Sequence, residues 1–197
     1  TDSFRLAEKV FLETLKIKLN LPYLIIPIKN TIEIIRVLET SAGEVLVEYN
    51  QHQISFKINN IYLTSRLVDG VYPDYRQIIP TTHLTQVVVL KADLQETLKL
   101  LNIFVDRLGQ ITITISPADK KIEFVAINDG GENTTHLEGV IEGEVVTVSL
   151  NVRYLLDCLQ SIHTDSLQIK FNGAHKPVVI KGVGDQSFTY LIMPINR

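Results

Sequence analysis

The chain has 197 residues, of which 45% are hydrophobic and 21% charged, as in an ordinary globular protein with one or two domains. No apolar run approaches the roughly 18 residues of a membrane-spanning helix, so we expect no membrane partner. The net charge of −3 provides no general attraction to nucleic acid, so contact with DNA would require a local basic surface. The single cysteine excludes an intrachain disulfide and, without a signal peptide, favours a cytoplasmic location.

The sequence contains three copies of one pattern, in which a strand is followed by a helix and three further strands. The copies cover residues 24–70, 87–143 and 145–194. Their helices are expected to begin near Lys29, Lys91 and Asn151, about 60 residues apart. A regular period of this length is typical of a supersecondary unit that has been copied and stacked.

The predicted helices cover residues 30–38, 92–108 and 152–162, and each has one apolar side. The apolar residues are Ile32, Ile35 and Leu38 in the first helix, Leu94, Leu98, Leu101, Val105 and Leu108 in the second, and Val152, Leu155, Leu156 and Leu159 in the third. One-sided helices indicate a helical layer packed on a sheet. We expect Cys158 in the third helix to be a small core residue rather than a catalytic one.

Short runs of alternating apolar and polar residues predict the strands. The expected strands after the helices cover residues 45–49, 54–57, 61–65, 111–116, 122–127 and 136–142. Because consecutive strands outnumber helices, the sequence predicts an α+β fold with antiparallel sheets. The best domain boundary lies near Pro80–His83 and divides the chain into residues 1–82 and 83–197.

No catalytic site can be found in the sequence. The five histidines have no metal-ligand spacing, and the chain contains no cysteine pair and no phosphate-binding loop. We therefore predict no catalytic residue, metal or cofactor, and a protein that binds or scaffolds other molecules rather than an enzyme.

Four segments carry a resemblance to a known family. They are Thr1–Ala7 (TDSFRLA), Thr64–Pro80 (TSRLVDGVYPDYRQIIP), Leu150–Asp157 (LNVRYLLD) and Tyr190–Pro194 (YLIMP). In this order they resemble motifs of the bacterial DNA sliding clamp, the β subunit of DNA polymerase III. The segment Thr64–Pro80 is long and specific, and the four segments together span the chain.

The resemblance implies a DNA-clamp fold, in which helices line the DNA side and antiparallel sheets lie outside. A clamp is a head-to-tail homodimeric ring, and each subunit has three similar domains built from paired repeats. The chain would be a processivity-factor fragment, with residues 1–82 as the C-terminal part of the middle domain and residues 83–197 as the C-terminal domain. Residues 1 to about 24 would be the last strand of a missing repeat and a connection.

The resemblance also implies partners and sites. DNA polymerase III, the clamp loader, other polymerases and repair proteins would dock motifs like Gln-Leu-x-Leu-Phe in an apolar pocket. Its expected lining is Thr1, Phe4, Arg5, Leu6, Pro73, Gln77, Ile78, Asn151, Tyr154, His175, Pro177, Leu191, Met193 and Pro194. Duplex DNA would be contacted only by the full ring, without sequence preference, through Lys29, Arg36, Lys91, Lys99 and Arg153.

Three departures from the family pattern fall on these positions. Ser3 and Phe4 stand where the family commonly has Gly and His, Gln77 where Arg is common, and His175 where an aliphatic residue is common. These changes are expected to alter the preferred motif. Two alternatives stay open: a stand-alone peptide-binding scaffold that forms no ring, and an enzyme on a similar scaffold. Sedimentation of a full-length protein would separate the first from a clamp, and an enzyme should have clustered titratable groups in a cleft.

Overall fold

The computed structural model describes residues 1–10 and 23–195, which form two compact units. Unit 1 consists of residues 1–10 and 75–195, and unit 2 consists of residues 23–74. The connection expected before residue 24 falls mostly outside the described residues. Within the described part of the chain, no helix is both long enough and apolar enough to cross a membrane.

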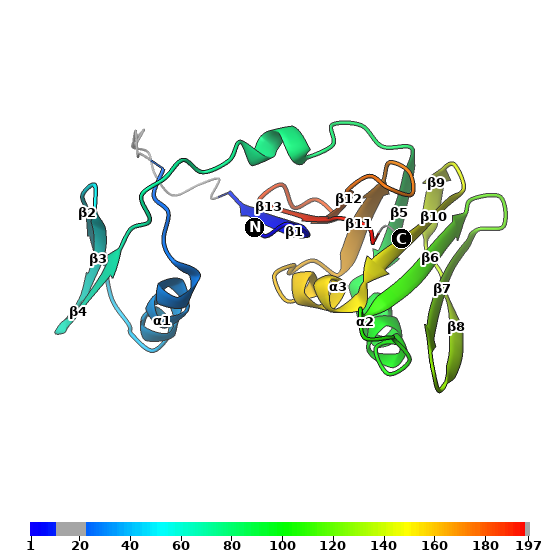
Figure 1. The fold of residues 1–197 in the computed structure, drawn as a ribbon, viewed down its shortest axis with the longest axis horizontal. Helices are drawn as coiled ribbons and strands as arrows, with labels where there is room; N and C mark the ends of the chain where they lie inside the picture. The colour runs from blue at the N-terminus through cyan, green and yellow to red at the C-terminus, as the bar shows by residue number, and fades with distance from the viewer. Residues whose placement is uncertain (11–22, 196–197) are drawn as a thin grey trace. The chain divides into compact units, whose positions relative to one another are not determined.

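Unit 1 contains two successive copies of the predicted pattern (Figure 1). The first copy is β5 (Thr85–Leu90), α2 (Lys91–Leu101), β6 (Gln110–Ser116), β7 (Lys121–Asn128), β8 (Gly131–Leu137) and β9 (Val140–Gly143). The second copy is β10 (Val146–Asn151), α3 (Val152–Leu159), β11 (Ser166–Phe171), β12 (Val178–Gly182) and β13 (Phe188–Ile192). The strand β1 (Arg5–Lys9) and the 3-10 helix η1 (Tyr75–Ile78) complete unit 1.

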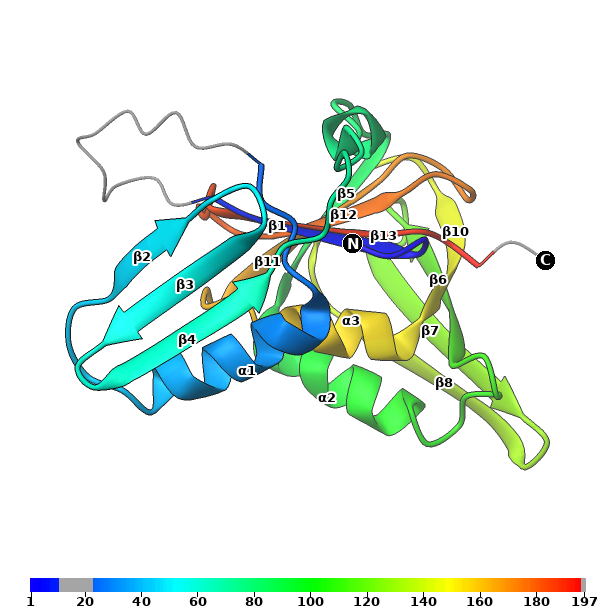
Figure 2. The same ribbon diagram turned by 60° about the vertical axis from the view of Figure 1, so that its left-hand side comes forward.

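The two copies exchange strands to form two sheets, in which all pairs are antiparallel, as predicted. One sheet has the order β1-β13-β12-β11-β5-β9 and the other β10-β6-β7-β8. The strand before each helix pairs with the other copy, β5 with β11 and β10 with β6. Both views show α2 and α3 side by side on one side of the sheets (Figures 1 and 2). Each copy therefore contributes strands to both sheets.

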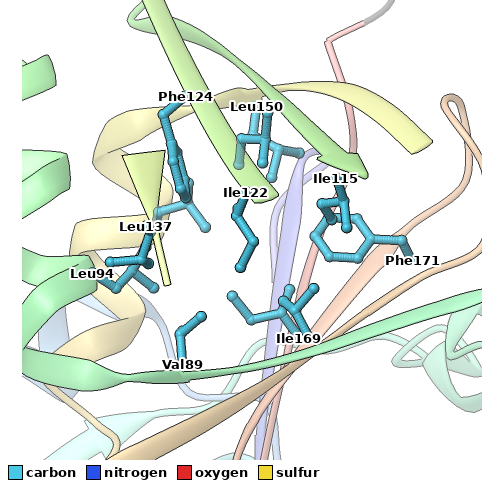
Figure 3. Close-up of a pocket in the computed structure, with 12 residues that line it drawn as sticks. Val89, Leu94, Ile115, Ile122, Phe124, Leu137, Leu150, Ile169 and Phe171 are labelled. Carbon is cyan, nitrogen blue, oxygen red and sulfur yellow. The ribbon is translucent and has the colours of Figure 1, made fainter. Parts of the chain in front are cut away.

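The core of unit 1 lies between the two sheets and the two helices. Ile111, Ile113 and Ile115 on β6 are buried, as their alternation predicts. Figure 3 shows side chains such as Phe124 and Phe171 converging from both sheets around a cavity of about 10 Å³ lined only by apolar residues. A space of this size holds at most one water molecule and offers it no polar partner. This cavity is part of the packing and is no ligand site.

Two predicted boundaries in unit 1 are wrong. The helix predicted over residues 92–108 ends at Leu101, because a turn follows in which the Asp106 carboxylate accepts the amide protons of Leu108 and Gln110 at 3.0 and 3.1 Å. The strand predicted over residues 136–142 is divided between β8 and β9. The division arises because β8 pairs with β7 in one sheet, whereas β9 pairs with β5 in the other. Periodicity along the sequence carries no information about such a change of sheet.

Unit 2 contains one copy of the pattern, with α1 (Ile28–Glu39), β2 (Leu46–Tyr49), β3 (Gln53–Ile58) and β4 (Ile61–Arg66). The sheet has the order β2-β3-β4. The pattern begins with a strand, which in this copy would cover residues 24–28, but these residues form no regular strand, although the Ile25 carbonyl accepts the Val68 amide at 2.8 Å. The predicted apolar stripe of α1 is wrong in part, because Ile34 is the buried residue while Ile32 is 56% exposed.

Candidate functional site

The outer face of the six-stranded sheet carries a small apolar cluster where β1 joins β13. The strand register places Leu6 opposite Leu191, and Leu191 opposite Val179 on β12. These three side chains are buried, and the partly buried Tyr75, Ile79 and Met193 pack against them. We call these six residues the apolar cluster. It brings together Leu6, Leu191 and Met193, three of the residues expected to line a pocket.

A cationic and aromatic group lies next to the cluster, at the beginning of β1. The Arg5 guanidinium is 4.4 Å from the centroid of the Tyr154 ring on α3, and Arg5 Nη1 donates to Asp157 Oδ2 at 2.5 Å. The hydrogen bond to Asp157 is the main reason why the pKa of Arg5 lies above its usual value. The Phe4 and Tyr154 ring centroids are 6.5 Å apart. Arg5, Phe4 and Tyr154 thus form one surface from two elements.

Asp2 fixes the turn that leads into β1. Its Oδ1 accepts the amide protons of Phe4 and Arg5 at 2.8 and 2.9 Å, and its Oδ2 accepts Arg5 Nε at 3.2 Å. Partial burial acts to raise the pKa of this carboxyl group, but the hydrogen bonds from Phe4 and Arg5 outweigh it and lower the pKa. The Thr1 hydroxyl also donates to the Arg5 carbonyl oxygen, at 2.9 Å. The first residues of the chain are therefore held in a defined shape.

Backbone contacts connect the two ends of this region. The Met193 amide donates to the Phe4 carbonyl oxygen at 2.8 Å, which continues the β1–β13 pairing by one step.

Asn151 caps α3, because its Oδ1 accepts the amide protons of Arg153 and Tyr154 at 2.9 and 3.4 Å. The cap positions Tyr154 at the first turn of the helix.

The remaining predicted pocket residues are more dispersed. His175 is exposed and Pro177 half-buried in the turn before β12, while Pro194 is buried after β13. Gln77 and Ile78 lie exposed in η1. Pro73 lies in unit 2 and is exposed there.

The pocket lining predicted from the sequence does not include Tyr75, Ile79, Val179 or Asp157. Periodicity gave no signal for Val179, because Val178, Val179 and Ile180 form a continuous apolar run in β12. The signal for Asp157 was weak, because a carboxylate on an exposed helix face normally remains solvated. Only the fold brings it to Arg5, 152 positions away in the sequence.

The five residues expected to face DNA all lie in or at the helices. Lys29, Lys99 and Arg153 are exposed, and Arg36 is exposed with Glu33 at 3.8 Å. Lys91 is half-buried, and its Nζ donates to the Ile162 carbonyl oxygen at 2.5 Å. The Lys91 side chain therefore links the start of α2 to the segment after α3. Lys99 and Arg153 are the more accessible of the unit 1 cations expected to face DNA.

The described residues include no group of three or more His, Cys, Asp or Glu side chains that could hold a metal ion. Cys158 is buried, as predicted, and burial raises the pKa of its thiol to about 12. The thiol therefore stays protonated and unreactive near neutral pH.

Comparison with known families decides the classification. Residues 76–196 match the family model of the DNA polymerase III beta subunit, C-terminal domain, and residues 1–74 match that of its central domain. The chain belongs to the DNA polymerase III beta subunit family. This agrees with the resemblance carried by the four sequence segments.

Individual members of the beta subunit family are similar along the whole chain. The Beta sliding clamp of Staphylococcus aureus is 29% identical over 201 aligned residues, which cover 100% of this chain and 52% of that protein. The Beta sliding clamp of Synechococcus elongatus is 33% identical over 150 residues, covering 75% of this chain and 40% of that protein. The chain thus spans about half the length of these curated relatives.

Solved structures of the family share the fold. The DNA polymerase sliding clamp from Bacillus subtilis is 27% identical with a TM-score of 0.92, covering 100% of this chain and 52% of that one. The sliding clamp from Bartonella birtlesii is 28% identical with a TM-score of 0.91, covering 100% of this chain and 56% of that one. The strand-exchanged sheets and helices described above are therefore the sliding-clamp fold.

Proposed function

We propose that this chain is part of a non-enzymatic DNA polymerase processivity factor and that its unit 1 binds short linear motifs of polymerases, clamp loader and repair proteins. Family membership and the names of the relatives support the processivity role. The motif-binding part rests mainly on one observation, the apolar cluster with Arg5 and Tyr154 beside it. An extended peptide suits such a surface, because its apolar side chains can pack on the partly buried Tyr75, Ile79 and Met193 while a few polar groups orient the backbone.

The proposed site uses the residues expected from the sequence, with four additions. Met193 would contact apolar side chains of the motif, and repacking of its flexible thioether would give several partners access to the buried Leu6 and Leu191. Tyr154 and Phe4 would contact the aromatic end. Tyr75, Ile79 and Val179 add to the apolar wall, and Asp157 fixes Arg5. Gln77 and His175, which depart from the family pattern, would affect which motif is preferred.

In the full-length protein we propose a homodimeric ring that encloses duplex DNA. Residues 1–82 of this chain would form the C-terminal part of the middle domain, and residues 83–197 would form the C-terminal domain. Lys29, Arg36, Lys99 and Arg153 would approach phosphates, and such contacts would be independent of sequence and sensitive to salt. With a net charge of −3, the 197-residue chain alone should bind DNA weakly. Tight retention on linear DNA at about 150 mM salt would contradict this.

A peptide titration tests the motif-binding proposal directly. A fluorescein-labelled Gln-Leu-Ser-Leu-Phe peptide should bind the wild type with a micromolar Kd, equivalent to about 8 kcal/mol, in an anisotropy titration. Met193→Ala and Tyr154→Ala should each weaken binding about tenfold. Ile127→Ala is a matched control, because Ile127 is 58% exposed on β7 in the other sheet. Equal affinities of all four proteins, or no binding by the wild type, would refute the site.

Sedimentation of the full-length protein tests the ring. A clamp is expected to be a dimer at micromolar concentration. A monomer that still binds the peptide would indicate instead a stand-alone peptide-binding scaffold.

A further inference from the structure

A hollow of about 170 Å³ lies beside the apolar cluster in unit 1. Its charged and titratable lining residues are all basic: His83 in the segment after η1, Lys170 on β11 and Lys181 on β12. The other lining residues are Ile79, Pro80, Thr81, Thr82, Phe171, Asn172, Pro177 and Val179. The lining therefore contains no carboxylate, and it offers hydroxyl and amide donors next to the basic groups.

The two lysines are close neighbours on the same face of the sheet. The register places Lys170 opposite Val179 and Lys181 opposite Gln168, so the lysines stand diagonally on adjacent strands. Diagonal neighbours have α-carbons about 7–8 Å apart, within reach of two long side chains. Within the part of the chain that the structure describes, neither lysine side chain nor His83 has a hydrogen bond or an ion pair. An anion between the two ammonium groups would relieve their repulsion.

The hollow is continuous with the apolar cluster. Ile79 and Val179 belong to both. The strand pairings place Leu6, Leu191, Val179 and Lys170 in one row across β1, β13, β12 and β11. Neighbouring strands are about 4.8 Å apart, so Lys170 is one strand beyond the last apolar residue of the row. A chain lying along this row would pass from apolar contacts to basic groups.

We propose that this hollow binds the carboxylate of an acidic residue that flanks the apolar motif of a docked peptide. The inference rests on the proposed function, since it extends the same peptide site. Lys170 and Lys181 supply the charge complementarity, and the threonine and asparagine side chains supply further donors. The expected partner is thus an extended peptide with an Asp or Glu next to its apolar motif.

The test uses peptides that differ only in charge outside the motif. One pair carries two Asp or two Asn residues before Gln-Leu-Ser-Leu-Phe, and a second pair carries them after it. Only one of the two positions should reach the hollow. At about 50 mM salt, the Asp peptide of that pair should bind the wild type about threefold to fivefold more tightly than its Asn counterpart. At about 300 mM salt the advantage should shrink, because salt screens exposed charges.

Lys170→Gln/Lys181→Gln should reduce the advantage to less than twofold and leave the affinity for the Asn peptides unchanged. Lys57→Gln/Lys120→Gln is the matched control, because it removes the same charge from exposed lysines outside the hollow and should retain the advantage. An advantage that survives in the first double variant, or none in the wild type, would overturn the inference.

The outcomes separate this inference from the proposed function. If the Asn peptides bind but the Asp peptides gain nothing, only the acidic preference is refuted. If the Asn peptides do not bind at all, the proposed function fails and the inference with it. If a phosphoserine peptide binds more tightly and the Asp peptides do not, the hollow binds phosphate, and the inference that it binds a carboxylate is overturned.

Discussion

Arg5 and Tyr154 are stacked across two elements that are far apart in the sequence, with the guanidinium 4.4 Å from the ring centroid. Asp157, one turn along the same helix, accepts a hydrogen bond from Arg5 at 2.5 Å. An arginine can stack on an aromatic ring and bind a carboxylate at once, because its guanidinium is planar. The pair therefore couples the first residues of the chain to α3 and fixes the polar side of the candidate peptide site.

Removing the carboxylate should loosen this arrangement without unfolding the protein. We expect Asp157→Asn to weaken binding of the Gln-Leu-Ser-Leu-Phe peptide about threefold, because Arg5 loses one of its two charged partners and keeps only Asp2. The melting temperature should change little, since the Arg5 and Asp157 side chains are 34% and 55% exposed. Anisotropy and thermal unfolding measure the two effects. Asp119→Asn, in an exposed turn, is the control, and an unchanged affinity in Asp157→Asn would show that Arg5 needs no such partner.

The lowered pKa of Asp2 predicts a dependence of stability on pH. A carboxyl group whose pKa is lower in the folded state stabilises the protein above its unfolded pKa of about 3.9, and the contribution is lost as pH falls through the folded pKa. Asp2→Asn should therefore lower the melting temperature at pH 6 by about 2 °C. The difference from the wild type should shrink as the pH approaches 3. A difference that stays constant with pH would contradict the ionic role of Asp2.

The core of unit 1 should depend strongly on Leu98. This α2 residue is 0% exposed, and Leu98→Ala should reduce the free energy of unfolding by about 3 kcal/mol through lost burial and the cavity left behind. Leu100 on the same helix is 44% exposed, so Leu100→Ala should cost below about 1 kcal/mol. Urea unfolding followed by circular dichroism would compare them. Similar costs for the two variants would contradict the orientation of α2.

Gly143, at the end of β9, has little room for a side chain. Its φ of +109° is unfavourable for other residues, and an added Cβ would collide with the Leu84 carbonyl oxygen. Gly143→Ala should destabilise unit 1 by about 2 kcal/mol or more. Gly70→Ala is the control, because an added Cβ at Gly70 meets nothing within 4 Å. Equal melting temperatures of the two variants would contradict the close approach of β9 to β5.

Cys158 should be protected from thiol reagents in the folded protein. Burial raises the pKa of its thiol to about 12, so both access and thiolate formation are suppressed. Reaction with 5,5′-dithiobis(2-nitrobenzoic acid) at pH 8 should be slow in the native state and rapid in denaturant. Rapid labelling of the native protein would show that α3 opens readily.

The sequence by itself determined the repeat, the antiparallel α+β class and the family. Strict alternation fixed the buried residues of β6, and the four family segments identified three of the six residues of the apolar cluster, Leu6, Leu191 and Met193. These properties depend on local periodicity and on residue identity, both of which are visible along the chain. The turn at Asp106, which keeps residues 106–110 out of the predicted helix, was missed because side-chain hydrogen bonds to the backbone compete with apolar periodicity and depend on geometry.

Only the tertiary structure decided which distant residues meet. It split residues 136–142 between two sheets, brought Asp157 to Arg5, and placed Lys170 in one row with Leu6, Leu191 and Val179. It also showed that Ile34 is buried in unit 2, whereas Ile32 is exposed. Register and strand order arise from long-range pairing, and a shift of one residue would move each side chain to the opposite face. Periodicity along the sequence does not specify the register or the strand order.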